Sequence, residues 1–248
     1  MLLHVPHAGV GVPGWARRHL LPDDEALAAE QAALTDHLTD RIALRASAVA
    51  AVAPWVVVNR VSRFVVDPER FPDEREEMAA VGMAAVYTHG TRGQRIRADD
   101  ADHRAALLAA YYTTWADTVA RLVDARLAAT GRAVLIDLHS YPSAPLPYEL
   151  HADGPRPPVC LGTDPAHTPP ELTAAARRAF AQVGGAATDS PFGGTYVPAR
   201  HHGTDRRVRS IMVELRRDGH MVEPAGPVTG GFAVAAAALA ALVDAVTS

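Results

Sequence analysis

The chain has 248 residues, of which 48% are hydrophobic and 21% charged, so we expect a single globular domain over residues 1–248. All 24 positive charges are arginines, and the absence of lysine excludes a Schiff base, a pyridoxal-phosphate anchor and the lysine of a phosphate-binding loop. The 28 acidic residues give a formal net charge of −4, and the scattered arginines form no basic stripe that would predict nucleic-acid binding.

The N-terminal segment predicts a buried strand that ends at a histidine. Residues 2–5 form an apolar run, which stops at the loop-forming sequence Pro6-His7-Ala8-Gly9. We therefore expect His7 at the end of a strand. Residues 1–6 have neither a charged leader nor a long apolar stretch, so we expect no signal peptide.

Two helices are predicted after this strand. The first begins at Asp23 or Asp24, either of which can cap it, and the second spans residues 35–51. Asp36 and Asp40 would then lie on the same face of the second helix.

The middle of the chain contains β-rich runs and one long helical pattern. Residues 55–58 and 64–66 predict two strands, and the polar segment 67–77 predicts an ordered loop. Residues 99–130 have the composition of a long helix, which Gly131 can cap.

The second half alternates short apolar runs with helical patterns. Residues 133–138 form an apolar run of strand length, typical of a strand that is buried on both faces. The elements predicted after it are residues 159–161, 170–183, 210–215 and 228–246. This alternation predicts a three-layer α/β/α fold with a mixed, mostly parallel sheet. Ligands of such sheets gather at the carboxyl ends of strands, where we expect His7, His139 and Glu214.

Neither the cysteine content nor the apolar segments predict a secreted or membrane protein. Cys160 is the only cysteine, so no internal disulfide can form, and its apolar neighbours indicate a role in the core. The longest apolar tract, residues 232–243, is too short and too rich in alanine to span a bilayer. We therefore expect a cytoplasmic protein.

The sequence Asp137-Leu138-His139-Ser140 follows a predicted strand. Such a strand can aim the His139 imidazole into a cleft, and Asp137 could accept the hydrogen bond that fixes its tautomer. The alternative is a histidine that is bonded only to its own loop. Together, His7, His139 and a carboxylate would form the set of two histidines and one carboxylate that is typical of catalytic zinc.

Asp36 and Asp40 are the candidates for that carboxylate. One of them could bind the metal while the other orients a ligand. The alternative is that Asp36 stabilises a helix N-terminus through the helix dipole and that Asp40 is an ordinary surface residue.

Glu214 is a lone carboxylate inside the apolar run Ile211-Met212-Val213-Glu214-Leu215. Burial of such a group without a partner is energetically costly. Either an arginine such as Arg216 neutralises it, or it faces the cleft and acts as the general base that activates water.

Arginines gather in two parts of the chain. Arg60, Arg63 and Arg70 surround a predicted strand and its loop, and Arg200 follows the segment Tyr196-Val197-Pro198-Ala199. Because a guanidinium can grip a carboxylate at two points, these arginines favour a substrate with free carboxylates. The alternative is a set of surface arginines without a ligand.

The ordered set of motifs resembles the N-formylglutamate amidohydrolase family. The matching segments are Pro6-His7-Ala8-Gly9, Thr35-Asp36-His37-Leu38-Thr39-Asp40, Val61-Ser62-Arg63-Phe64-Val65-Val66-Asp67-Pro68-Glu69-Arg70, Asp137-Leu138-His139-Ser140, Pro191-Phe192-Gly193-Gly194 and Ile211-Met212-Val213-Glu214. They span nearly the whole chain in the expected order.

The resemblance implies a fold similar to zinc carboxypeptidases and aminoacylases, and one bound zinc ion. It also implies hydrolysis of a small anionic N-acyl amino acid, N-formyl-L-glutamate, to formate and L-glutamate in histidine degradation. His7, His139 and one aspartate of the Asp36/Asp40 pair look like the metal ligands, and Glu214 looks like the general base. The residues that it assigns to the substrate pocket are Arg63, Arg70, Tyr87 and Arg200.

The sequence departs from the related carboxypeptidases at one point. They use a His-x-x-Glu pair, whereas the residue at the corresponding distance from His7 is Val10. Two other functions stay open: a zinc hydrolase for another N-acyl amino acid or a short peptide, and a non-catalytic carboxylate-binding protein on a hydrolase scaffold.

Overall fold

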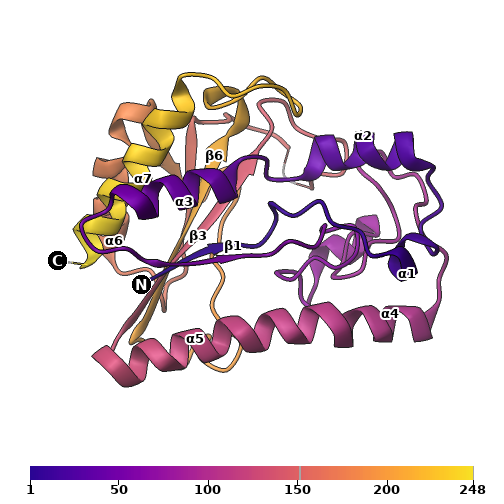
Figure 1. Cartoon of the computed structure of the whole chain (residues 1–248), viewed down its shortest axis with the longest axis horizontal. Coiled ribbons are helices and arrows are strands. Elements are labelled where there is room, and N and C mark those ends of the chain that lie inside the picture. The colour runs from indigo at the N-terminus through magenta and orange to yellow at the C-terminus, as the bar shows by residue number, and fades with distance from the viewer. Residues whose placement is uncertain (151, 248) are drawn as a thin grey trace.

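Six strands form one sheet, and helices cover both of its faces (Figure 1). The computed structural model describes residues 1–150 and 152–247. In spatial order the strands are β2 (Trp55–Val58), β1 (Leu2–Val5), β3 (Ala133–Tyr141), β6 (Val208–Arg216), β4 (Val159–Gly162) and β5 (Ala186–Thr188). Neighbouring strands are parallel except β6 and β4, which are antiparallel. The expected mixed, mostly parallel sheet is therefore confirmed.

The helices form two layers. They are α1 (Gly14–Arg17), α2 (Asp24–Leu34), α3 (Thr39–Val49), α4 (Ala101–Leu107), α5 (Thr114–Thr130), α6 (Pro170–Ala179) and α7 (Gly231–Thr247), with a π-helical turn at Leu108–Thr113 and 3-10 turns at Glu77–Val81, Ala181–Val183 and Arg217–Gly219. Helices α3, α6 and α7 pack together on one face of the sheet, and α5 covers the other (Figure 1). None of the described helices is both long enough and apolar enough to span a membrane.

Side-chain alternation along β3 separates the two faces of the sheet. Ile136 and Leu138 enter the core cluster beneath α3, α6 and α7. Leu135 belongs instead to the cluster beneath α5. Because successive side chains of a strand point to opposite faces, Asp137 and His139 share the face of Leu135.

The register of β6 places Glu214 directly opposite His139 on β3. Val213 and Leu215, on either side of Glu214, enter the core cluster that also contains α7. Glu214 therefore faces the same side of the sheet as His139.

The helix predicted for residues 35–51 begins later than expected, at Thr39. Asp36 lies in the turn before it, where Leu38 adopts a left-handed conformation with φ of 68°. The Thr39 hydroxyl donates a hydrogen bond to the Asp36 carbonyl at 2.7 Å. The prediction that Asp36 and Asp40 share a helical face is wrong, because the helix begins between them.

The strand predicted for residues 64–66 is also wrong, since this segment forms a turn. The Val65 N–H donates to the Ser62 carbonyl at 2.8 Å. Phe64 and Val65 are buried in two different core clusters. These residues are apolar because the turn buries them in the core on two sides, and not because they alternate along a strand.

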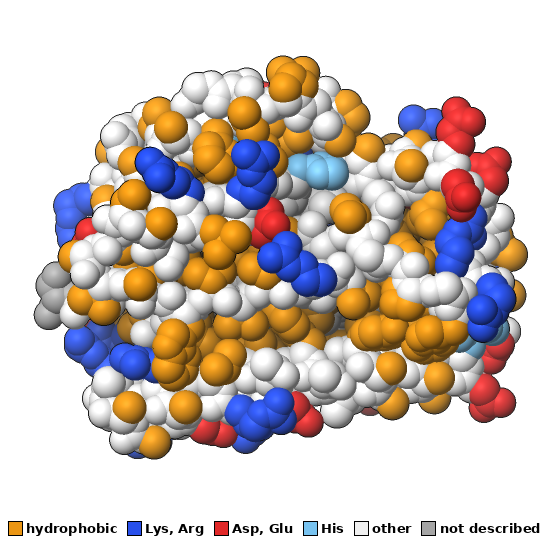
Figure 2. All heavy atoms as spheres, viewed as in Figure 1, with side chains coloured by type: hydrophobic (Ala, Val, Ile, Leu, Met, Phe, Trp, Pro, Cys, Tyr) orange, Lys and Arg blue, Asp and Glu red, His pale blue; other side chains and the backbone are white. Residues whose placement is uncertain are grey.

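The surface shows no continuous basic area on the face that Figure 2 presents. Among the described residues of this face, arginine side chains are scattered, and acidic side chains gather at the end of the molecule that carries the starts of α2 and α4.

Candidate active site

The side chains of His7, Asp36 and His139 converge at the carboxyl ends of β1 and β3. The Nδ1 atoms of His7 and His139 lie 3.2 Å apart. Asp36 Oδ2 lies 3.0 Å from His139 Nδ1 and 3.7 Å from His7 Nδ1. All three residues are buried.

These distances fit a divalent cation held by all three side chains. A tetrahedral zinc ion with bonds of about 2.0 Å separates neighbouring ligand atoms by about 3.3 Å. The separations here, between 3.0 and 3.7 Å, lie on both sides of that value. Three protein ligands leave a fourth position free for water or substrate.

His7 is oriented by Asp67. His7 Nε2 donates to Asp67 Oδ1 at 2.8 Å, and this bond turns Nδ1 towards His139. Burial alone would raise the pKa of Asp67, but the neighbouring His7 and Arg63 hold this pKa well below its usual range. The backbone beyond His7 passes so close to Arg60 that a Cβ on Gly9 would lie 2.4 Å from the Arg60 carbonyl carbon.

His139 is oriented in the same way by the strand that carries it. His139 Nε2 lies 3.0 Å from Asp137 Oδ1, and the other oxygen of Asp137 accepts from the Tyr196 N–H at 3.0 Å. This contact lies within ion-pair distance but lacks the geometry of a hydrogen bond, and His139 Nδ1 faces both His7 and Asp36. Each histidine thus has a carboxylate beside its Nε2 atom, as zinc-binding imidazoles commonly do, and its Nδ1 atom faces the cluster.

Asp36 is tied to the end of β1 through its backbone. Its N–H donates to the His7 carbonyl at 3.1 Å, and Arg217 Nη2 lies 3.4 Å from its Oδ1. Burial alone would raise the pKa of Asp36, but the neighbouring imidazoles of His139 and His7 hold it well below its usual range. Asp36 is therefore ionised, as a metal ligand must be.

Glu214 lies beside this cluster without a hydrogen-bonding partner among the described residues. Its Oε2 atom is shielded from solvent and accepts no hydrogen bond. Burial raises the pKa of Glu214 to about 7, which suits a general base near neutral pH. Arg216 does not neutralise it, because the Arg216 guanidinium donates to Asp218 at 2.8 Å.

Sequence reasoning overlooked Glu69 and His4. Glu69 Oε2 lies 3.2 Å from His139 Nε2 and 3.8 Å from His7 Nδ1, so this carboxylate borders the cluster. His4 is fully buried in β1 and hydrogen-bonds to Asp137 at 2.8 Å. The signal for His4 was available, because a single histidine interrupts the apolar run of the first strand.

A cavity of about 450 Å³ opens over the cluster. Its wall includes His7, Asp36, His139, Glu69 and Glu214. Three arginines also line it, namely Arg63, Arg70 and Arg217. Of these, Arg63 and Arg70 were predicted as pocket residues and Arg217 was not.

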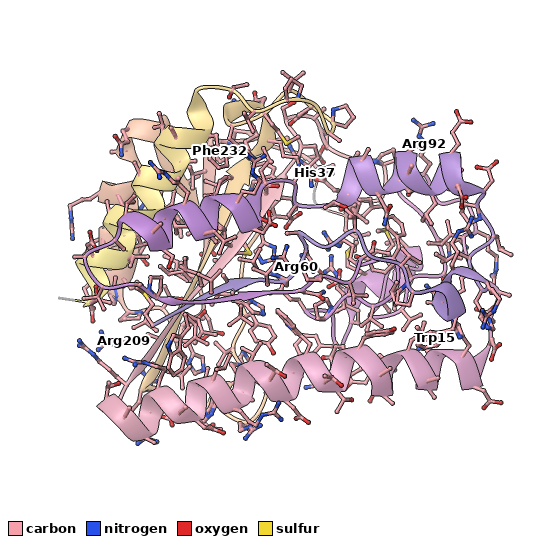
Figure 3. The ribbon with its side chains drawn as sticks, in the orientation of Figure 1. Trp15, His37, Arg60, Arg92, Arg209 and Phe232 are labelled. Atoms are coloured by element: carbon pink, nitrogen blue, oxygen red, sulfur yellow. The ribbon has the colours of Figure 1, made fainter. Side chains whose placement is uncertain are left out.

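The other predicted site residues lie elsewhere. Tyr87 is fully buried behind the cavity, where its hydroxyl donates to Asp67 at 2.5 Å. The Asp40 carboxylate pairs with Arg60 at 3.0 Å, and Figure 3 shows Arg60 close to the start of α3. Arg200 pairs with Asp124 at 2.7 Å. Neither Asp40 nor Arg200 lines the cavity.

Two solved structures share this fold. The N-formylglutamate amidohydrolase from Ralstonia eutropha JMP134 superposes with a TM-score of 0.83 at 19% sequence identity, covering 99% of this chain and 91% of the other. A gene product from Agrobacterium tumefaciens superposes with a TM-score of 0.72 at 18% identity, covering 100% and 90%. At such low identities these matches support the fold alone. No curated protein matches the sequence.

The family of the chain follows from its sequence, which matches a family model. The model of the N-formylglutamate amidohydrolase family matches residues 1–221, which include every residue of the cluster and of the cavity wall described above. The chain belongs to the N-formylglutamate amidohydrolase family.

Proposed function

We propose that the protein is a zinc-dependent hydrolase that cleaves the amide bond of a small N-acyl amino acid. One observation carries the proposal: two imidazole nitrogens and one carboxylate oxygen, each with its own supporting contacts, converge within 3.7 Å of one another beside Glu214. His7, Asp36 and His139 would hold the ion. When bound there, zinc supplies a Lewis acid that polarises the scissile carbonyl and makes water acidic enough to react near neutral pH.

The side chains around the ion supply the rest of the chemistry. Glu214 accepts a proton from the attacking water at its carboxylate and delivers it to the departing amide nitrogen. Its pKa of about 7 allows both transfers at neutral pH. Asp67 and Asp137 keep the two imidazoles in place, so that the ligand set is organised before the substrate arrives.

N-formyl-L-glutamate is the compound in the family name and the first substrate to assay. The expected products are formate and L-glutamate. A role in histidine degradation depends on this substrate being the natural one. The buried thiol of Cys160, the only cysteine, suits a reducing compartment, and we place the protein in the cytoplasm on that ground.

The proposal is tested by metal analysis combined with turnover. Purified protein should contain one zinc ion per chain, and complete chelation should abolish amide hydrolysis until zinc is restored. Glu214→Gln should lower kcat by about 10²-fold to 10⁴-fold while it retains zinc. A chain that hydrolyses N-acyl amino acids equally well without any metal would refute the proposal, and a chain that binds such ligands without turnover would be a non-catalytic binding protein.

A further inference from the structure

The three arginines that line the cavity differ in whether their N–H groups already donate to protein acceptors. Arg63 donates to Asp67 Oδ2 from both Nε and Nη2, at 3.2 and 2.7 Å, and its Nη1 reaches the Leu34 carbonyl at 3.4 Å. Arg217 donates to the hydroxyl and the carbonyl of Ser140 at 3.2 and 3.1 Å, and also to the Ala33 carbonyl. Protein acceptors therefore occupy both guanidinium groups.

Arg70 makes no hydrogen bond to any described residue. Its nearest carboxylates are Asp67 Oδ2 at 3.8 Å and Glu76 Oε1 at 3.6 Å. Both already accept hydrogen bonds, Asp67 Oδ2 from Arg63 and Tyr87, and Glu76 Oε1 from the backbone of Met78. The Arg70 side chain is 27% exposed and lines the cavity, so its fork of donors is open to a ligand.

The remainder of the cavity offers apolar surface and negative charge. Its apolar lining includes Leu34, Phe71, Met78, Leu146, Phe192 and Met212. The carboxylates of Glu69 and Asp164 also line it, together with polar residues such as Ser140, Tyr148 and Thr195. His202 lines it as well, but its Nε2 lies 3.4 Å from the Asp164 carboxylate and is not free. A second substrate carboxylate in this space would lack a free cationic partner and would face like charges, and burial of an unpaired charge is strongly unfavourable.

We infer that the substrate carries a single carboxylate, held by Arg70, and an apolar side chain that lies against the apolar lining. This inference rests on the proposed function, because it takes the amide at the metal cluster to be the scissile bond. It narrows the substrate class to N-acyl derivatives of amino acids such as methionine or leucine. N-formyl-L-glutamate, with two carboxylates, is then the poorer substrate.

The test compares N-formyl-L-methionine with N-formyl-L-glutamate, whose side chains have similar lengths. We expect kcat/KM of the zinc-loaded enzyme to be higher for the methionine compound by about tenfold or more, mainly through KM. N-formyl-L-glutamine, a neutral match for glutamate, should fall between them. Binding of the same compounds to the Glu214→Gln variant, measured by calorimetry, should rank them in the same order.

Each outcome bears on one of the two claims. A preference for N-formyl-L-glutamate overturns the inference and leaves the hydrolase function standing. Tighter binding of N-formyl-L-methionine without turnover by the wild type removes the hydrolase function and supports the substrate class. If Glu214→Gln binds none of the compounds, the inference falls as well.

Two substitutions in the cavity wall test the carboxylate-binding role of Arg70 and the lack of a second cation separately. Arg70→Met should weaken binding of both compounds about equally, because it removes the holder of the carboxylate that they share. Phe71→Arg, at a residue that is 44% exposed and therefore tolerant of change, adds a second cation and should shift the preference towards N-formyl-L-glutamate. Phe71→Gln is the control without charge. If Phe71→Arg and Phe71→Gln give the same preference, lack of a second cation does not determine specificity.

Discussion

His4 Nδ1 donates a hydrogen bond to Asp137 Oδ1 across 2.8 Å. The direction follows from Trp115, whose indole N–H can only donate and which lies 3.1 Å from His4 Nε2. The lone pair of His4 therefore points at Trp115 and not at a metal. Although His4, Glu69 and Asp137 bring potential ligand atoms within 4.8 Å of one another, we expect them to position His139 and not to hold a second ion.

Loss of the His4 hydrogen bond should weaken zinc binding without removing a ligand. His4→Ala frees Asp137 to move, and we expect the zinc dissociation constant to rise by about 10-fold to 100-fold, as measured by competition with a chelator. His4→Asn, which retains a donor near the position of Nδ1, should recover part of the affinity. Two zinc ions per chain at saturation would show that His4 is a ligand after all.

Asp36 and Asp40 provide a matched pair that identifies the third ligand. Asp36→Asn removes the charge from the carboxylate beside both histidines and should abolish stoichiometric zinc binding. Asp40→Asn removes the charge that pairs with Arg60, whose side chain is 68% exposed, and keeps an oxygen for the Arg41 N–H, so it should leave zinc content and turnover unchanged. Equal zinc loss in the two variants would contradict the assignment.

The buried ion pair between Asp67 and Arg63 should matter for stability as well as for the site. Asp67→Ala leaves the Arg63 side chain, which is 10% exposed, without its nearest carboxylate. We expect the free energy of unfolding of the zinc-free protein to fall by about 3–5 kcal/mol in urea denaturation. The double variant Asp67→Leu/Arg63→Met should be more stable than Asp67→Ala, since it also removes the unpaired charge of Arg63. If the double variant is the less stable of the two, the loss comes from packing and not from the unpaired charge.

Cys160 should resist alkylation until the protein unfolds. Its side chain is fully buried, and burial raises the pKa of its thiol to about 11. At pH 8 only about one molecule in a thousand would carry the thiolate. Because the folded pKa lies above the unfolded one, the thiol contributes stability at neutral pH that is lost as the pH rises towards 11. Iodoacetamide labelling followed by mass spectrometry, with and without urea, checks the expectation; rapid labelling of the native protein would contradict it.

Patterns along the chain predicted the sheet and the ends of its strands. Apolar runs of strand length lead directly into His7 and His139, and parallel strands bring their carboxyl ends to one edge, so these two residues could be expected to meet. Glu214 stood out because a carboxylate inside an apolar strand needs a special environment.

Features that depend on the path of irregular segments could not be predicted in this way. The left-handed conformation of Leu38 takes Asp36 out of the helix that its sequence favours. Arg63 pairs with Asp67, which follows a turn. This pairing could not be predicted, because the β-branched residues of the segment favour a strand. Whether an arginine is free for a ligand depends on acceptors that approach from other parts of the chain, as the difference between Arg70 and Arg217 shows.

The pairing of β3 with β6 determines which face of the sheet Glu214 occupies. A slip of β6 by one residue would point Glu214 into the apolar layer beneath α7 and bring Val213 or Leu215 to the cavity side. Tight packing of those two neighbours against α7 is thus what turns the Glu214 carboxylate towards the cavity. We therefore expect a substitution that enlarges or shrinks Val213 to lower turnover in a protein that still folds, although Val213 does not line the cavity.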